Sequence, residues 1–131
     1  MLAIETTRPV YRSRMPHLEF VLDCSEPDRA ARFWVGALGY RLYGAAANYR
    51  SLVPPNGESG PKLILQGVAE PKTVKNRMHL DLHAADVDAE VARLLSLGAT
   101  RASNLIVEHG TNWVVLHDPD GNEFCVCQLD G

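Results

Sequence analysis

The chain has 131 residues, of which 46% are hydrophobic and 22% are charged, so its size and composition suit one globular domain or two small fused modules. Its formal net charge of -3 at pH 7 argues against nucleic acid or an anionic membrane surface as a partner, because a net negative field attracts neither. It contains no apolar run of about 18 residues, so we predict no membrane span.

The first half begins with an N-terminal extension, residues 1–16, in which residues 9–12 are a candidate short strand. Alternating polar and apolar residues then predict a strand at 17–23. The Ser25 hydroxyl is expected to cap a helix that contains Pro27 in its first turn and ends before Gly39. Three further strands are predicted, at 40–43, 48–53 and 62–68.

The second half follows a polar linker at 70–77 and has the same order of elements. A strand is predicted at 79–83, and Asp86 caps a helix that ends at Gly98. Val87, Val91, Leu94 and Leu95 form the apolar stripe of this helix. Further strands are predicted at 99–102, 105–108, 113–117 and 123–129.

This similarity of order and spacing is an internal repeat, in which Glu19 corresponds to His79 with one insertion. A half of about 55 residues cannot bury both its helix stripe and its sheet alone. The sequence therefore predicts an α+β fold of two tandem βαβββ modules, at 17–69 and 78–131, which form one concave mixed sheet with the helices outside.

The strand at 79–83 is the strongest indication of a functional site. Strict alternation places His79, Asp81 and His83 on one face and Leu80 and Leu82 on the other. We expect the polar face to line a cavity, with His79 and Asp81 as candidate catalytic groups. The pattern does not decide whether His83 faces that cavity or the exposed end of the sheet.

Other candidate residues depend on strand register. Trp113 and His117 share a face with Val115, and they become a stacking wall and a rim acid or base only if the last hairpin turns that face inward. Cys125 and Cys127 also share a face, where a buried structural pair is the common outcome. The basic linker residues Lys72, Lys75 and Arg77 are expected to be solvated or, alternatively, to clamp an anion at the cavity mouth.

Three segments together resemble the vicinal oxygen chelate superfamily, which includes glyoxalase I, extradiol dioxygenases and the fosfomycin and bleomycin resistance proteins. They read Leu-Asp-Cys-Ser-Glu-Pro-Asp-Arg-Ala-Ala-Arg-Phe-Trp at 22–34, Glu-Pro-Lys-Thr-Val-Lys-Asn-Arg-Met-His-Leu-Asp-Leu-His at 70–83, and His-Asp-Pro-Asp-Gly-Asn-Glu-Phe at 117–124. Within the superfamily they look like the glyoxalase-like domain branch. The resemblance covers residues 17–129 and implies the glyoxalase-like fold, a fold that hosts many chemistries.

The resemblance also implies positions for one divalent metal ion, with ligands on the first and last strands of each module. Carried over, these positions are Glu19, Gln66 (or Leu65, if the register slips by one), His79 and Cys125. Metal-binding members usually have His or Glu there, so the chain departs from the family pattern at the two last-strand positions. The Cys favours zinc, and iron, nickel and manganese are the other candidates.

The candidate residues fall into three overlapping groups. The catalytic candidates are His79, Asp81 and Glu19. The substrate-binding candidates are Trp113, His117, Arg77, Gln66 and Cys125. The metal-binding candidates are Glu19, His79, Gln66 and Cys125.

The predicted function is to bind a small organic molecule in the cavity, with an atypical metal site, and whether the protein is an enzyme is left open. One alternative is a metal-dependent lyase, isomerase or dioxygenase, and another is a resistance protein that sequesters an antibiotic. His79 and Asp81 as a metal-free acid-base pair are a further alternative.

The expected setting is the cytoplasm, because Cys24, Cys125 and Cys127 are an odd set without metal-type spacing and no secretory segment is evident. The resemblance implies a homodimer. We expect no nucleic acid or membrane as a partner.

Overall fold

The computed structural model describes residues 2–7 and 16–130. Their contacts divide the chain into two compact units, Met1–Pro71 and Lys72–Gly131. The candidate strand at 9–12 lies outside the described residues. None of the helices in the described part of the chain is long and apolar enough to cross a membrane.

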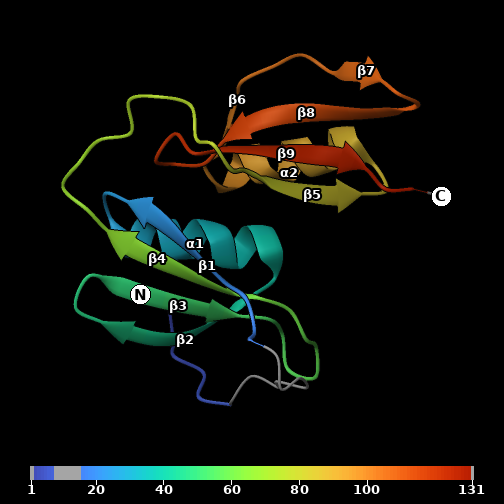
Figure 1. The fold of residues 1–131 in the computed structure, drawn as a ribbon. Coiled ribbons are helices and arrows are strands. Elements are labelled where there is room, and N and C mark those ends of the chain that lie inside the picture. Colours follow the sequence, from blue (N-terminus) through green and yellow to red (C-terminus); the bar gives the residue numbers. More distant parts are fainter. Residues whose placement is uncertain (1, 8–15, 131) are drawn as a thin grey trace. The chain divides into compact units, whose positions relative to one another are not determined.

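The first unit contains one helix and a four-stranded mixed sheet in the order β1-β4-β3-β2 (Figure 1). Its elements are β1 (Glu19–Cys24), α1 (Pro27–Leu38), β2 (Arg41–Ala46), β3 (Tyr49–Val53) and β4 (Lys62–Gly67). β1 runs parallel to β4, and the other pairs are antiparallel.

The second unit repeats this plan in a five-stranded sheet in the order β5-β9-β8-β6, with β7 paired to β8 (Figure 1). Its elements are β5 (Leu80–Ala84), α2 (Val87–Leu97), β6 (Thr100–Arg101), β7 (Ile106–Glu108), β8 (Thr111–His117) and β9 (Glu123–Gln128). β5 runs parallel to β9, as β1 does to β4. The predicted α+β fold of two tandem modules is confirmed, but the described strands form two mixed sheets, one in each module, and not the one concave sheet that we predicted.

The one-residue difference in helix length explains the insertion in the repeat. α1 has 12 residues and α2 has 11, and both end at a glycine in the left-handed conformation, Gly39 and Gly98. Asp86 caps α2 as predicted, since its carboxylate accepts a hydrogen bond from the Ala89 N–H at 3.0 Å. The prediction for α1 is wrong by one residue: Glu26 is the N-cap and makes no side-chain capping bond. The Ser25 hydroxyl instead accepts a hydrogen bond from Arg29.

Each helix covers the apolar face of its own sheet. In the second module, Val91 and Leu94 of α2 are buried, whereas Leu95, predicted to be buried, is 38% exposed. The strand residues on the buried face are fully covered, and they are Val114, Leu116, Phe124 and Val126. Since side chains alternate along a strand, the neighbouring residues of β8 and β9 lie on the opposite face.

In the first module, Arg41 of β2 is buried and ties part of the N-terminal extension to the sheet. Its guanidinium donates hydrogen bonds to the carbonyl oxygens of Glu5, Thr7 and Pro54 at 3.3, 2.9 and 3.1 Å. The Glu5 N–H also donates to the Leu42 carbonyl at 2.7 Å. Residues 5–7 therefore extend the packing of their own module.

Candidate functional site

The face of the second sheet opposite α2 carries a cavity of about 390 Å³. All residues that line it belong to the second compact unit, and they are Lys75, His79, Asp81, Trp113, Val115, Glu123, Cys125 and Cys127. The strand register explains this grouping, since Asp81 pairs with Cys125, Val115 with Cys125 and Trp113 with Cys127. Paired residues of neighbouring strands project to the same side of a sheet.

The same register decides the orientation of Trp113, which the sequence left open. Trp113 and Val115 lie on the cavity face, opposite the buried Val114 and Leu116. His117 shares their face and pairs with Glu123, two residue pairs beyond the pair of Val115 and Cys125. Among the described residues, the lining includes neither His117 nor the exposed Arg77.

His79 and Asp81 form the polar end of the cavity. His79 immediately precedes β5, and its Nε2 lies 3.2 Å from Asp81 Oδ1. Both side chains are nearly half exposed, at 41% and 46%. The pair is therefore accessible to a ligand and has the arrangement in which a carboxylate orients an imidazole.

The two cysteines form the floor beside this pair. Burial, together with the charge of Asp81 and its hydrogen bond with the thiol, raises the pKa of Cys125 to about 11. Burial and the same carboxylate also raise the pKa of Cys127. In the metal-free protein both thiols are therefore protonated at neutral pH, so neither is an activated nucleophile.

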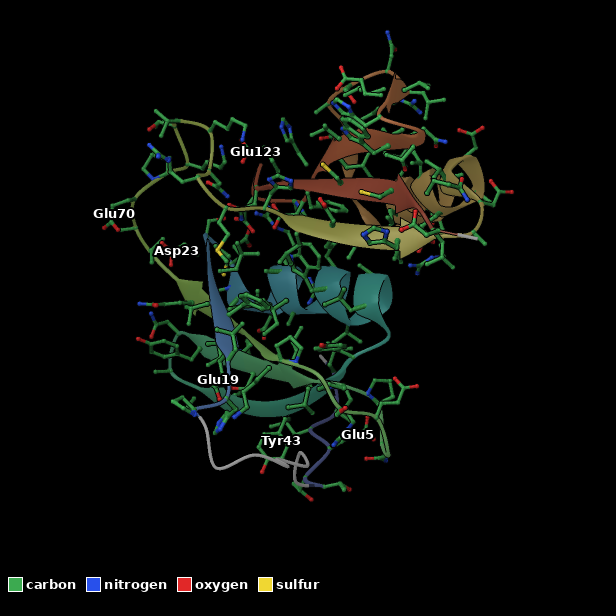
Figure 2. The ribbon with its side chains drawn as sticks, turned by 45° about the vertical axis from the view of Figure 1, so that its right-hand side comes forward. Glu5, Glu19, Asp23, Tyr43, Glu70 and Glu123 are labelled. Atoms are coloured by element: carbon green, nitrogen blue, oxygen red, sulfur yellow. The ribbon has the colours of Figure 1, made fainter. Side chains whose placement is uncertain are left out.

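The segment before β5 is anchored to the last hairpin and is not a free linker. Lys72 Nζ lies 2.8 Å from Glu123 Oε1, and the Asn76 N–H donates to Glu123 Oε2 at 3.0 Å. The Asn76 side chain also donates to Asn122 Oδ1 at 2.8 Å. These bonds hold the backbone on both sides of Lys75, which is why a residue of this segment forms a cavity wall. Figure 2 labels Glu123 beside the turn that precedes β9.

The turn between β8 and β9 is itself held by the Asp118 carboxylate. It accepts hydrogen bonds from the Asp120 N–H and the Asn122 N–H, both at 2.9 Å, and from the Asn122 side chain at 3.2 Å. Asp118 and Asn122 are only 3% and 7% exposed. The Asp-Pro-Asp-Gly-Asn sequence therefore builds a rigid base for the cavity wall.

Glu123 offers a test of this anchoring through pH. Burial disfavours its charge, but hydrogen bonds from Lys72 and the Asn76 N–H outweigh that effect and lower its pKa from 4.5 to about 2. A lowered folded-state pKa stabilises the protein above pH 4.5, and this contribution is lost as the pH falls toward 2.

Glu123→Gln is therefore expected to reduce the free energy of unfolding at pH 7 by about 1–2 kcal/mol. The difference from the parent protein should shrink below pH 4.5 and vanish near pH 2, as measured by urea unfolding at a series of pH values. Glu70→Gln, which changes an exposed carboxylate, is the control. A pH-independent difference would show that the ion pair with Lys72 is not its source.

The first module holds Glu19 and Gln66. Glu19 pairs in register with Lys62, and its carboxylate lies 3.4 Å from the Lys62 ammonium. Gln66 pairs with Asp23 at the other end of the two strands. Figure 2 labels Glu19 and Asp23 toward opposite ends of β1. Glu19 and Gln66 therefore do not meet within their module.

Strand register also identifies the first-module counterpart of Cys125. In the second module Cys125 pairs with Asp81, two residues after His79. The equivalent pair in the first module is Val21 with Ile64. Ile64 thus occupies the place that the sequence pattern assigned to Gln66. An isoleucine offers no ligand atom, so the group of polar donors belongs to the second module.

Donor atoms of His79, Asp81 and Cys125 lie within 4.8 Å of one another. Imidazole, carboxylate and thiolate are the ligand types that zinc binds, and a catalytic zinc site needs three protein ligands and one open position. The residues present therefore fit such an ion. Sequence reasoning reached these residues but missed Glu123 and Cys127, although both alternate with Cys125 along one strand.

Comparison with known proteins gives matches that cover most of the chain. A family model described as a glyoxalase-like domain matches residues 19–127. No curated protein matches the sequence.

Solved structures match over most of their length. The fosfomycin resistance protein FosX from Listeria monocytogenes is 10% identical, with a TM-score of 0.72 and coverage of 90% of this chain and 96% of that one. A glyoxalase/bleomycin resistance protein/dioxygenase family enzyme from Burkholderia phytofirmans PsJN is 16% identical, with a TM-score of 0.69 and coverage of 86% and 97%. At these identities the likeness shows the fold, and the family model confirms the resemblance to the glyoxalase-like domain branch.

Proposed function

Since the chain belongs to the glyoxalase-like domain family, we propose that its second module binds a small organic molecule in the cavity beside Trp113. The observation that carries the proposal is the cavity itself. Its volume of about 390 Å³ lies in the range of small-molecule pockets, which combine an apolar lining with a few convergent polar groups.

The lining suggests the chemistry of the ligand. Trp113 and Val115 offer an apolar wall for a ring or a branched chain. Lys72 already neutralises Glu123, whereas the Lys75 ammonium makes a long hydrogen bond, 3.4 Å, to the neighbouring carbonyl of Asn76. Lys75 also lines the cavity, so its ammonium is available to an anionic group of the ligand. The proposed ligand carries an apolar ring or branch and one anionic or hydroxyl group.

The test uses the intrinsic fluorescence of the protein. Its two tryptophans are Trp34, which is 1% exposed in the core, and Trp113 in the cavity, so a ligand in the cavity perturbs only Trp113. Small aromatic carboxylates, fosfomycin and bleomycin would be titrated in the presence of a chelator. Failure of every compound to change the fluorescence at millimolar concentration would count against the proposal.

Replacement of Trp113 supplies the matching prediction. Trp113→Ala is expected to weaken binding of a ligand found in this way about tenfold, because aromatic pairing and the lost apolar contact together are worth about 1–2 kcal/mol. Isothermal titration calorimetry measures the change, and Trp113→Phe should restore most of it. Val107→Ala removes an exposed apolar side chain of β7 outside the cavity and should leave affinity unchanged.

A second candidate function is metal-dependent chemistry as a lyase, isomerase or dioxygenase, and the donor set of His79, Asp81 and Cys125 favours it. A divalent ion there would polarise an oxygen of the ligand. His79 is held by Asp81, whose Oδ1 lies 3.2 Å from Nε2, so its other ring nitrogen, Nδ1, would accept or donate a proton when His79 is not bound to metal. Glu19, Gln66 and His117 stay candidate site residues, and the homodimer stays a prediction.

A further inference from the structure

The two parallel strands β5 and β9 carry a second group of metal-type donors, displaced along the sheet from the first. The segment 79–83 presents His79, Asp81 and His83 at every second residue, and β9 presents Cys125 and Cys127 in the same way. The register pairs Asp81 with Cys125 and His83 with Cys127. Five donor side chains therefore share one face of two neighbouring strands.

The second group consists of Asp81, His83 and Cys127, whose donor atoms lie within 4.8 Å of one another. Ligand atoms around a tetrahedral zinc ion are separated by roughly 3.5 Å, given metal–ligand distances of about 2.0–2.3 Å. Small rotations of exposed side chains close that gap. His83 and Asp81 are exposed and Cys127 is half-buried, so an ion can reach the group from solvent.

We propose that Asp81, His83 and Cys127 bind a thiophilic divalent ion of the zinc class, at a site separate from the donor set of His79 and Cys125. Imidazole and thiolate select such ions over magnesium and calcium, which prefer oxygen ligands. Three protein ligands leave a fourth position for water. Asp81 is common to both groups.

The first module serves as an internal control for the alternative explanation, in which these residues have only a structural role in the sheet. The first-module counterparts of Asp81, His83 and Cys127, taken in that order by strand register, are Val21, Asp23 and Gln66. The same parallel pair of strands therefore forms without histidine or cysteine at these positions. The imidazole and thiol of the second module are not a requirement of the fold.

The proposed site lies at the edge of the cavity. Among the described residues, the cavity lining includes Asp81 and Cys127 but not His83. The inference is thus independent of the proposed function, which is tested with metal removed.

The experiment is a titration of the chelator-treated protein with Co²⁺ in a reductant that contains no thiol. Thiolate bound to Co²⁺ gives a charge-transfer absorption band, which reports cysteine ligation directly. The double variant His79→Ala/Cys125→Ala removes the first group and is expected to keep one Co²⁺ with a thiolate band. Adding Cys127→Ala should abolish the band, and competition with Zn²⁺ should displace the Co²⁺.

His83→Ala in the double variant is expected to weaken Co²⁺ binding by at least about tenfold. Replacing even a residue that only hydrogen-bonds to a metal ligand typically lowers metal affinity by that factor. His109→Asn, which changes a histidine that is 89% exposed on the β7–β8 turn, should have no effect. Circular dichroism checks that each variant is folded. Absence of a thiolate band in the double variant, or a band that survives Cys127→Ala, would overturn the proposal.

Discussion

Asp118→Ala is expected to lower the free energy of unfolding by about 3 kcal/mol, which is a large effect for a turn residue. The carboxylate accepts three hydrogen bonds in the β8–β9 turn and is 3% exposed. Its removal leaves the N–H groups of Asp120 and Asn122 without this acceptor. Each unsatisfied buried donor costs about 1–3 kcal/mol.

The loss should extend from the turn to the cavity. The Asn122 side-chain oxygen accepts a hydrogen bond from the Asn76 side chain, and the Glu123 carboxylate accepts one from the Asn76 N–H. A loosened turn therefore releases the segment that carries Lys75. Urea unfolding at pH 7 measures the stability, and the fluorescence titration measures ligand binding in the cavity. Asp130→Ala removes an exposed acid near the C-terminus and is expected to change neither. If Asp118→Ala behaves like this control, the turn does not hold the cavity wall.

Much of the fold follows from local signals in the sequence. Gly39 and Gly98 end their helices because each adopts a left-handed conformation that glycine tolerates best. Asp86 begins the second helix because its carboxylate satisfies a backbone N–H. The missed cap at Ser25 shows the limit of this reasoning, since Pro27 has no N–H and the hydroxyl bonds to Arg29 instead.

The candidate site depends on register, which local signals do not determine. Alternation placed Trp113 with Val115, but only the pairing of Trp113 with Cys127 shows that they face the cavity. The same holds for Gln66, which the sequence pattern matched to Cys125 and the register matches to Cys127. A register shift of one residue moves every side chain to the other face of a sheet.

The polar segment before β5 shows a different limit. Composition indicated a solvated linker, because Lys72 and Lys75 are surrounded by polar residues. Lys72 is nevertheless mostly buried against Glu123, a residue 51 positions away in the sequence. Pairing of this kind is tertiary and leaves no local pattern. Of the basic residues in this segment, Lys75 lines the cavity, and its contact with a ligand stays a proposal.

The shared position of Asp81 leads to the second large expected effect. Asp81→Asn keeps the shape of the side chain but removes its charge, and a neutral amide is a much poorer ligand for zinc-class ions than a carboxylate. Since Asp81 belongs to both donor groups, the substitution should weaken Zn²⁺ binding at each of them by about 100-fold, or about 2.7 kcal/mol. No single replacement of a histidine or cysteine should affect both.

Calorimetric Zn²⁺ titration of the parent protein, Asp81→Asn and the control Asp88→Asn measures this effect. Asp88 is an exposed acid of α2, and its replacement changes the net charge by the same amount without touching either group. Asp81 is 46% exposed, so its replacement should leave the fold intact, which urea unfolding verifies. Equal Zn²⁺ affinity in Asp81→Asn and Asp88→Asn would mean that Asp81 only orients His79. Weaker Zn²⁺ binding at only one of the two groups would mean that the two sites do not share the Asp81 carboxylate.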